Sequence, residues 1–318
     1  TSCPFATPLA MRFLSPAVGG PPITSARFPP LSAAIPTSHH ARAVALMLLS
    51  TACFTANILL VRAISALGFD HVWLVACARF IVGLAVIATL YRREWRPAHL
   101  WRNGKLIERG LVGGFGVYIT YLAITKAGAG RTTFINNTYV IWGALLAAWL
   151  LREKLRPAVL AGSVFALGGL ALLTNVFSAT AHPTIYDGAA VLSALVSGYV
   201  AVIIRQLHAT EHSSTIVAAQ CSYGLILCSV PALRGLPPVP GLVLALLLVA
   251  GGCTAAGQLA LTRAYRDLPV AEGSLIQMLT PLGVACGGAA FFHEQFSLHE
   301  FAGAALILVG IALTVRRR

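Results

Sequence analysis

The chain has 318 residues, of which 57% are hydrophobic and 10% charged, and its formal net charge is +13. Soluble domains carry about 25% charged residues. This composition, with a mean hydropathy of +0.79, therefore excludes an ordinary soluble protein and predicts an integral membrane protein in contact with the lipid bilayer.

The first 42 residues differ from the rest of the chain. They are rich in Pro, Ser and Ala and contain no acidic residue. Such a segment cannot bury enough apolar surface to fold, and it lacks the continuous apolar stretch of a signal peptide. We expect residues 1–42 to form a disordered cytoplasmic tail. An organellar transit peptide, and a true start at Met11 that would leave residues 1–10 outside the native protein, stay open as alternatives.

Apolar stretches fill the remainder, and each is long enough to cross the hydrocarbon core as a helix, which takes about 20 residues. Several connections are very short, so neighbouring helices must run antiparallel. We therefore predict an all-α integral membrane protein with ten transmembrane helices, at residues 43–66, 71–91, 107–125, 131–151, 156–177, 185–205, 213–231, 240–262, 269–292 and 298–315.

The basic residues predict the orientation of these helices, because Lys and Arg favour cytoplasmic loops. With the N-terminus inside, eighteen of the 23 Lys and Arg residues fall on the cytoplasmic side, Arg109 among them. Only Arg62, Lys126, Arg131 and Arg234 fall outside, and Arg79 lies within a span. Both termini should be cytoplasmic. Because the basic residues are distributed loop by loop, topology explains the charge better than nucleic-acid binding, and we expect no nucleic-acid partner.

The chain contains an internal repeat. When residues 127–174 are aligned with residues 268–315, ten of 48 positions are identical without a gap. The similarity extends to "YLAITKA" at 121–127 against "QLALTRA" at 258–264, and to "VACARF" at 75–80 against "VAAQCS" at 217–222. Five helices are thus duplicated, as residues 43–177 and 185–315. Because five is odd, the second copy enters from the opposite side, which makes two inverted five-helix repeats of the kind found in secondary transporters.

Each repeat has a glutamate before its final helix, at Glu153 and Glu294, followed by Ala-Gly and then a further Gly. A carboxylate there can accept hydrogen bonds from the free N–H groups of the next helix. The small residues would form a smooth face for close helix packing. We expect these segments to specify tight hairpins, although a role in substrate binding stays open.

At these residues the sequence resembles the drug/metabolite transporter superfamily, in its ten-helix EamA-like branch. The features that carry the resemblance are the two "E-[KQ]-[LF]" turns followed by "AG…G", Arg79 in the second helix and "LTPLGVACGG" at 279–288. The resemblance covers residues 43–315 and implies transport of small metabolites through a central cavity between the halves. Val140 replaces the counterpart of Pro281, so the two halves are expected to flex unequally.

Polar residues within the spans are candidates for substrate binding, because ionisable and amide groups inside a membrane need partners. Arg79 is either a structural anchor or a binding residue, and the amides could instead bond neighbouring helices. In a cavity together with aromatic side chains they would bind a small solute. The candidate substrate-binding residues are Asn57, Arg79, Tyr118, Tyr121, Asn136, Asn137, Trp142, Tyr199, Gln220, Gln258 and Gln277.

The favoured function is a secondary, non-ATP transporter of small metabolites or drugs that works by alternating access through this cavity. We find no catalytic or metal-ligand motif and no nucleotide-binding loop, so an enzyme and a cofactor are not expected. A non-transporting receptor or scaffold, or a membrane-embedded enzyme, remains the alternative. The expected location is the bacterial inner membrane, with an organellar membrane as the alternative. Substrate, direction, coupling ion and oligomeric state are not readable from the sequence.

Overall fold

The computed structural model describes residues 37–94, 97–127, 129–174, 184–293 and 297–315. The predicted tail lies largely outside these residues, and α1 begins at Thr37. The described residues form helices and no strand, and the helices are α1 (Thr37–Ala66), α2 (Val72–Leu90), α3 (His99–Arg102), α4 (Gly104–Ala127), α5 (Ala129–Asn137), α6 (Tyr139–Leu150), α7 (Pro157–Leu173), α8 (Ile185–Leu207), α9 (Ser213–Ala232), α10 (Gly241–Asp267), α11 (Val270–Gln277), α12 (Leu279–Phe292) and α13 (Leu298–Val315).

Within the residues that the structure describes, each of the ten predicted stretches is mainly helical. Six helices are long and apolar enough to cross a membrane by length and composition: His39–Ala66, Val72–Leu90, Ile185–Leu207, Ser213–Ala232, Gly241–Asp267 and Val270–Phe292. Pro157–Leu173 and Leu298–Thr314 are shorter apolar helices. The presence of ten crossings therefore stays a prediction. Large apolar side chains such as Trp149 (77% exposed) and Phe291 (75%) give the bundle a surface suited to contact with lipid.

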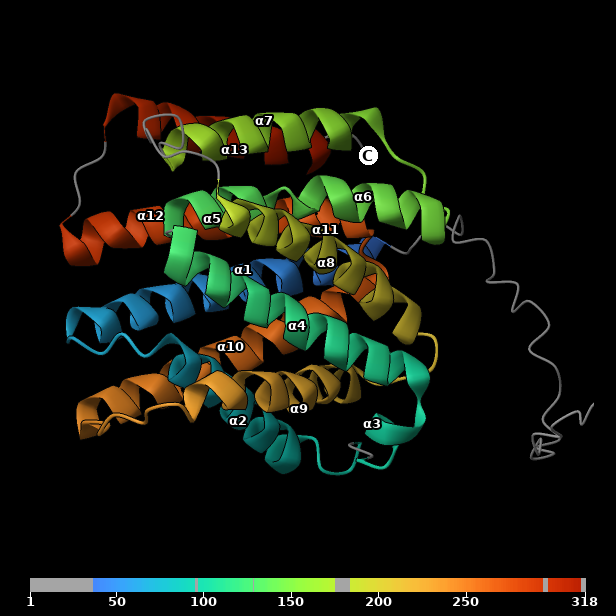
Figure 1. The fold of residues 1–318 in the computed structure, drawn as a ribbon. Coiled ribbons are helices and arrows are strands. Elements are labelled where there is room, and N and C mark those ends of the chain that lie inside the picture. The colour runs from blue at the N-terminus through green and yellow to red at the C-terminus, as the bar shows by residue number, and fades with distance from the viewer. Residues whose placement is uncertain (1–36, 95–96, 128, 175–183, 294–296, 316–318) are drawn as a thin grey trace, which may run out of the picture. The chain divides into compact units, whose positions relative to one another are not determined.

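The two halves of the chain interlock (Figure 1). The first helix of the first half, α1, packs along α10 of the second half, and its counterpart α8 packs along α4 of the first half. In the same way α2 packs on α9, and α7 packs along α13. Each half therefore buries its apolar faces mainly against the other half, and a transport site between the halves would touch both.

The glycines of the repeated hairpins account for the α7–α13 contact, whose two helices lie side by side in Figure 1. A Cβ on Gly162 would lie 2.5 Å from the carbonyl oxygen of Gly310, and a Cβ on Gly169 would lie 2.5 Å from that of Gly303. Since Gly162 is near the start of α7 and Gly310 near the end of α13, the helices run antiparallel. The structure confirms the predicted close packing of this glycine face.

The fourth predicted helix of each half, at residues 131–151 and 269–292, ends in the same way. Arg152 and His293, which occupy matching positions in the repeat, each have a φ of 55°. After Arg152 the chain turns, so that the Glu153 N–H donates to the Ala147 carbonyl at 3.3 Å. The left-handed residue ends the helix and starts the turn into the next one. This conformation belongs to the duplicated hairpin and has no recognisable signal in the residue type.

Candidate functional site

The fourth and ninth predicted helices are each interrupted for one residue near their middles, although that residue keeps right-handed helical backbone angles. The first is divided into α5 and α6 at Thr138, and the second into α11 and α12 at Met278. Pro281, in the first turn of α12, has no N–H to continue the helix from α11. No proline marks the other break. There the Asn137 amide donates to the Thr133 carbonyl at 2.8 Å and the Thr138 hydroxyl to that of Ile135 at 2.7 Å.

Two amides of the candidate set hold these broken helices against the opposite half. Ser193 of α8 donates to the Asn136 Oδ1 at 2.8 Å. Gln277 Nε2 donates to the Ser50 hydroxyl of α1 at 2.9 Å. Asn136 and Gln277 are matched by the repeat, and the two serines lie on the matched helices α8 and α1. The two bonds thus occupy equivalent positions, although the serine donates in the first and accepts in the second, and each ties one half to the other.

Several other candidate residues contact neighbouring helices. Asn57 Nδ2 donates to the Ala250 carbonyl of α10 at 3.0 Å. The ring of Tyr118 lies 4.8 Å from that of Trp73, measured between centroids, and Tyr121 is half-buried against the main apolar core. The hydroxyl of Tyr199 donates to Glu108 Oε1. These contacts pack the four residues against neighbouring helices.

Three candidate residues converge on one small cavity between α2, α9 and α10. Arg79, Gln220 and Gln258 line it, together with Cys221 and Thr254. Its volume is about 10 Å³, which is room for about one water molecule. The repeat matched Arg79 with Gln220 and Gln258 with Tyr121, without showing that Arg79, Gln220 and Gln258 meet.

Arg109, which the sequence analysis counted only among the basic residues of the cytoplasmic side, also reaches this region. It lies in α4, its side chain is fully buried, and its Nη2 donates to Gln220 Oε1 at 2.8 Å. Sequence reasoning missed Arg109 because it stands only three residues into a predicted span and follows a run of loop arginines. Gly113, one turn later, leaves the space that its guanidinium occupies: a Cβ there would lie 2.0 Å from Nη1.

A larger cavity, of about 380 Å³, lies beside the break between α5 and α6. Trp142 is the candidate residue that contributes to it. Its lining is almost entirely apolar and comes from α5, α6 and α8: Phe134, Ile135, Thr138, Ile141, Trp142 and Val191. A cavity of this size and character suits a small solute with an aromatic or aliphatic part.

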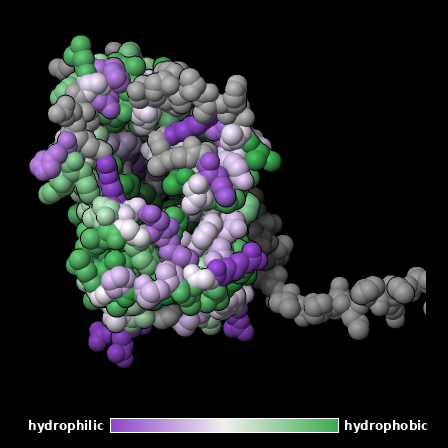
Figure 2. Space-filling model, turned by 60° about the vertical axis from the view of Figure 1, so that its left-hand side comes forward, coloured by the Kyte–Doolittle hydropathy of each residue, from purple (hydrophilic) through white to green (hydrophobic). Residues whose placement is uncertain are grey.

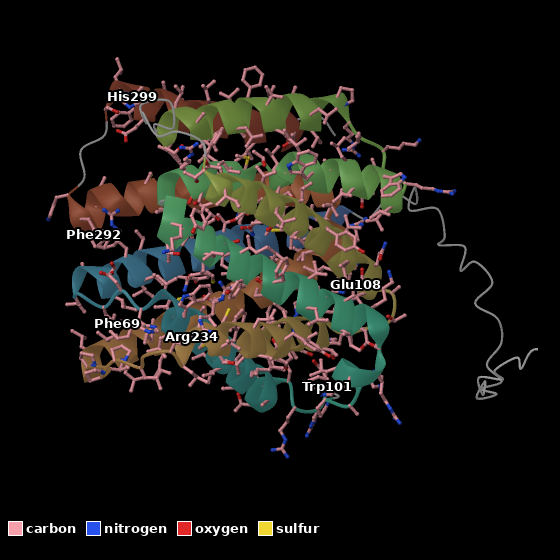
Figure 3. All side chains as sticks on the ribbon, viewed as in Figure 1. Phe69, Trp101, Glu108, Arg234, Phe292 and His299 are labelled. Atoms are coloured by element: carbon pink, nitrogen blue, oxygen red, sulfur yellow. The ribbon has the colours of Figure 1, made fainter. Side chains whose placement is uncertain are left out.

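The two ends of the bundle differ. Figure 3 labels Phe69 and Phe292 at one end of the bundle and Glu108 toward the other. We call them the Phe292 end and the Glu108 end. Every residue of α11 is buried, whereas among residues 131–137 of its counterpart α5 only Thr132 is. Figure 2, which turns the Phe292 end forward, shows a hollow in that face. Equivalent half-helices are therefore closed in at one end and partly exposed at the other.

Glu153 and Arg205 join the two halves where α6, α8, α10 and α11 end or begin. Their Oε1 and Nε atoms are 2.5 Å apart, and Glu153 Oε2 accepts from the N–H of Val270, the first residue of α11, at 3.2 Å. Arg205 also donates to the Leu268 carbonyl at 2.5 Å. Burial raises the pKa of Glu153, against the opposing effects of Arg205 and the Val270 N–H.

This contact corrects one detail of the sequence analysis. Glu153 does accept from the start of a helix, as expected, but the helix is α11 of the opposite half and not α7, the next helix along the chain. Its counterpart Glu294 lies outside the described residues. The turn that contains Glu153 therefore connects the halves and does more than specify a local hairpin.

This fold defines a helical membrane protein with two interlocked halves and a broken helix in each, an architecture that secondary transporters use. A model of the EamA-like transporter family matches residues 41–175 and 184–316. The chain belongs to this family of membrane transporters, within the drug/metabolite transporter superfamily. The resemblance noted in the sequence is thereby confirmed.

Among solved structures, 29 chains match this one. A crystal structure of a protein in this group has a TM-score of 0.73 and 18% sequence identity, and the match covers 87% of this chain and 97% of that chain. At this identity the likeness shows the fold alone. No match was found among curated proteins.

Proposed function

We propose that the protein moves a small metabolite or drug across the membrane by alternating access, without ATP, and that its substrate binds beside the break between α5 and α6. The cavity of about 380 Å³ at that break carries the proposal. Transporters built from inverted repeats bind their substrates near the membrane midplane, at the interface between the repeats, and this cavity has Val191 of the second half in its lining. The apolar lining favours an amphipathic solute over a highly charged one.

The asymmetry of the two ends supports an outward-facing state. With both termini cytoplasmic, as the basic residues favour, the Glu108 end is inside and the Phe292 end is outside. The buried α11 and the Glu153–Arg205 contact then close the inside. The partly exposed α5 and the hollow in Figure 2 open toward the outside. An inward-facing state would exchange the environments of α5 and α11.

The candidate residues of the sequence analysis fall into three groups under this proposal. Trp142 lines the larger cavity and is the first choice for substrate contact. Arg79, Gln220 and Gln258 line the smaller cavity. Asn57, Tyr118, Tyr121, Asn136, Asn137, Tyr199 and Gln277 stay predictions as binding residues.

Flux into proteoliposomes, screened across amphipathic metabolites and drugs, tests the proposal. Once a substrate is found, Trp142→Ala should raise its apparent KM by about tenfold or more, because an aromatic wall of the site is lost. Trp149→Ala is the matched control: Trp149 lies two turns further along α6, is 77% exposed, and should be replaceable without effect. Equal effects of the two replacements on KM would contradict this binding site. If none of the screened solutes shows flux, the proposal of transport is rejected.

We propose the bacterial inner membrane as the location, with an organellar membrane as the alternative. The orientation can be tested separately in a background without native cysteines. A cysteine at Pro238, in the exposed connection between α9 and α10, should react with an impermeant maleimide in intact cells. A cysteine at Ala209, between α8 and α9, should react only after the membrane is opened. The reverse pattern would contradict the orientation.

A further inference from the structure

We propose that the small cavity between α2, α9 and α10 binds a small anion, held by Arg79, Gln220 and Gln258, with Arg109 positioning Gln220. This site is separate from the larger cavity to which the substrate is assigned above. Its ligand is either a free halide ion such as chloride or the carboxylate group of a solute.

The first reason is unneutralised positive charge. Arg79 Nε, and Arg109 Nε and Nη1, are buried nitrogens without a hydrogen-bond partner. Within the part of the chain that the structure describes, no carboxylate forms an ion pair with either side chain. A cation in the membrane interior is costly and is found paired or beside a polar pathway. An anion beside Arg79 would supply the missing charge and an acceptor for its N–H groups.

The second reason is the direction of the hydrogen-bonding groups. Arginine can only donate, so the group that Arg109 bonds on Gln220 must be the carbonyl oxygen. This fixes the orientation of the amide and leaves its two N–H donors for another partner. The hydroxyl of Thr254 already donates to the Ala250 carbonyl. The cavity thus combines a guanidinium with amide donors and has no carboxylate in its lining, a set that favours an anion over a cation.

The third reason is the space that the sequence keeps for Arg109. Its guanidinium folds back over Gly113, where any larger residue would collide with Nη1. Alanine is intrinsically more favourable than glycine in a helix, and at this position glycine leaves the space that Nη1 occupies. Arg109 is held where it orients Gln220, and it acts on the anion through that amide.

The volume of about 10 Å³ limits the ligand to a single ion or to one end of a larger molecule. A whole metabolite would require α2, α9 and α10 to separate. Chloride and a carboxylate oxygen present the same chemistry to the donors, so the experiment must distinguish these two sources.

The test uses the full-length protein in detergent, with melting followed by tryptophan fluorescence while chloride replaces gluconate at constant ionic strength. A ligand that binds the folded state raises the melting temperature in a saturable way. The wild type should show this rise. Arg79→Gln should shift its half-saturation concentration upward by about tenfold or more, because a charged hydrogen bond is lost. Arg102→Gln, at an exposed residue of α3, should behave like the wild type.

Gln220→Glu is the second variant, and it does not depend on the folding of an arginine variant. It puts a fixed carboxylate of the same shape beside the guanidinium of Arg109, in the cavity that Arg79 also lines. It should melt higher than the wild type in gluconate and should no longer respond to chloride. Arg109→Gln should raise the half-saturation concentration. A purely structural role for Arg109 would instead lower the melting temperature equally at every chloride concentration.

Formate, the smallest carboxylate, identifies the source. If formate raises the melting temperature and chloride then adds no further rise, the site is assigned to a carboxylate group. If chloride raises the melting temperature and formate does not, the site is assigned to a halide ion. No response of the wild type to either ion would overturn the proposal. So would an unchanged chloride response in Arg79→Gln and Gln220→Glu. Because the readout is binding and not flux, failure of the transport assay would leave this result interpretable.

Discussion

Arg152 adopts a backbone conformation that ordinary residues avoid. Its φ of 55° lies in the left-handed region, where the Cβ of an L-residue approaches its own backbone at a cost of about 1 kcal/mol. Glycine has no Cβ and is the usual residue after a helix end. Arg152 is exposed, so no buried contact holds it in this conformation. The hairpin and the contacts of Glu153 next to it must stabilise the turn.

Arg152→Gly should therefore stabilise the protein, by up to about 1 kcal/mol. The expected result is a higher melting temperature in detergent with unchanged expression. Arg156→Gly is the control, because Arg156 also lies in this turn but has a φ of −83°. It should give no gain. A fall in melting temperature with Arg152→Gly would show that the arginine side chain itself matters.

Among single residues, the sequence identified Arg79 as a candidate for substrate binding but did not identify Arg109. Arg79 stands alone in an apolar stretch, where any charge is conspicuous. Arg109 follows Arg102 and Lys105 at a predicted span boundary, and boundaries are the least reliable part of a sequence-based assignment. Its burial depends on Gly113 and on Gln220 of a helix more than 100 residues away. No local pattern contains that information.

Helices α7 and α13 show how the elements are joined. Their mutual contact depends on glycines at matching positions in the repeat, where the backbones approach closely. In lipid, small residues at an interface allow van der Waals contact that the hydrophobic effect does not supply. The hydrophobic pattern predicted both helices. The glycines marked the packing face of each helix, but the pattern could not predict that these two faces pack on each other, because it contains no information on which distant segment each face meets.

Gly169→Ala should weaken this pairing. The new methyl group would lie 2.5 Å from the Gly303 carbonyl oxygen, while the same change at the neighbouring Gly168 meets nothing within 4 Å. We expect Gly169→Ala to lose about 1–3 kcal/mol through overpacking. Gly168→Ala should be neutral or slightly stabilising. Melting temperatures of the two variants measure the difference, and similar values would contradict the close approach.

The breaks in the two long helices were only half predictable. Pro281 marks the break between α11 and α12 in the sequence. The break at Thr138 has no proline and instead involves side chains that bond carbonyls of their own helix. Asn and Thr do this in many settings without breaking a helix. Tertiary contacts, such as that of Asn136 with Ser193, decide the outcome here.

For the whole molecule, the repeat is the property that the sequence predicted best, because the duplicated segments imply two halves of five helices. The difference between the buried α11 and the partly exposed α5 could not be predicted, since both halves have the same hydrophobic pattern and burial depends on contacts between distant segments. The Glu153–Arg205 contact is placed where it would hold the closed end together. Both side chains are nearly buried, at 11% and 8% exposed.

Glu153→Gln should loosen this end. Glutamine can still accept from the Val270 N–H, but Arg205 loses its charged partner in a site with little access to water, which is costly. We expect a shift of about 1–2 kcal/mol toward the open state, or five- to thirtyfold in its population. The readout is the rate at which an impermeant maleimide labels a cysteine at Ala271, a buried position of α11, in inside-out vesicles from a background without native cysteines.

Glu94→Gln provides the matched control for that shift. Glu94 also forms an ion pair, with His212 at 3.2 Å, but these side chains are 49% and 44% exposed. Exposed pairs contribute about 0–1 kcal/mol, and neither residue joins α6 to α11. Labelling at position 271 should therefore match the wild type in Glu94→Gln and rise in Glu153→Gln. Equal labelling in all three proteins would show that the Glu153–Arg205 contact does not hold the end closed, because the exposure of α11 would then not depend on the carboxylate of Glu153.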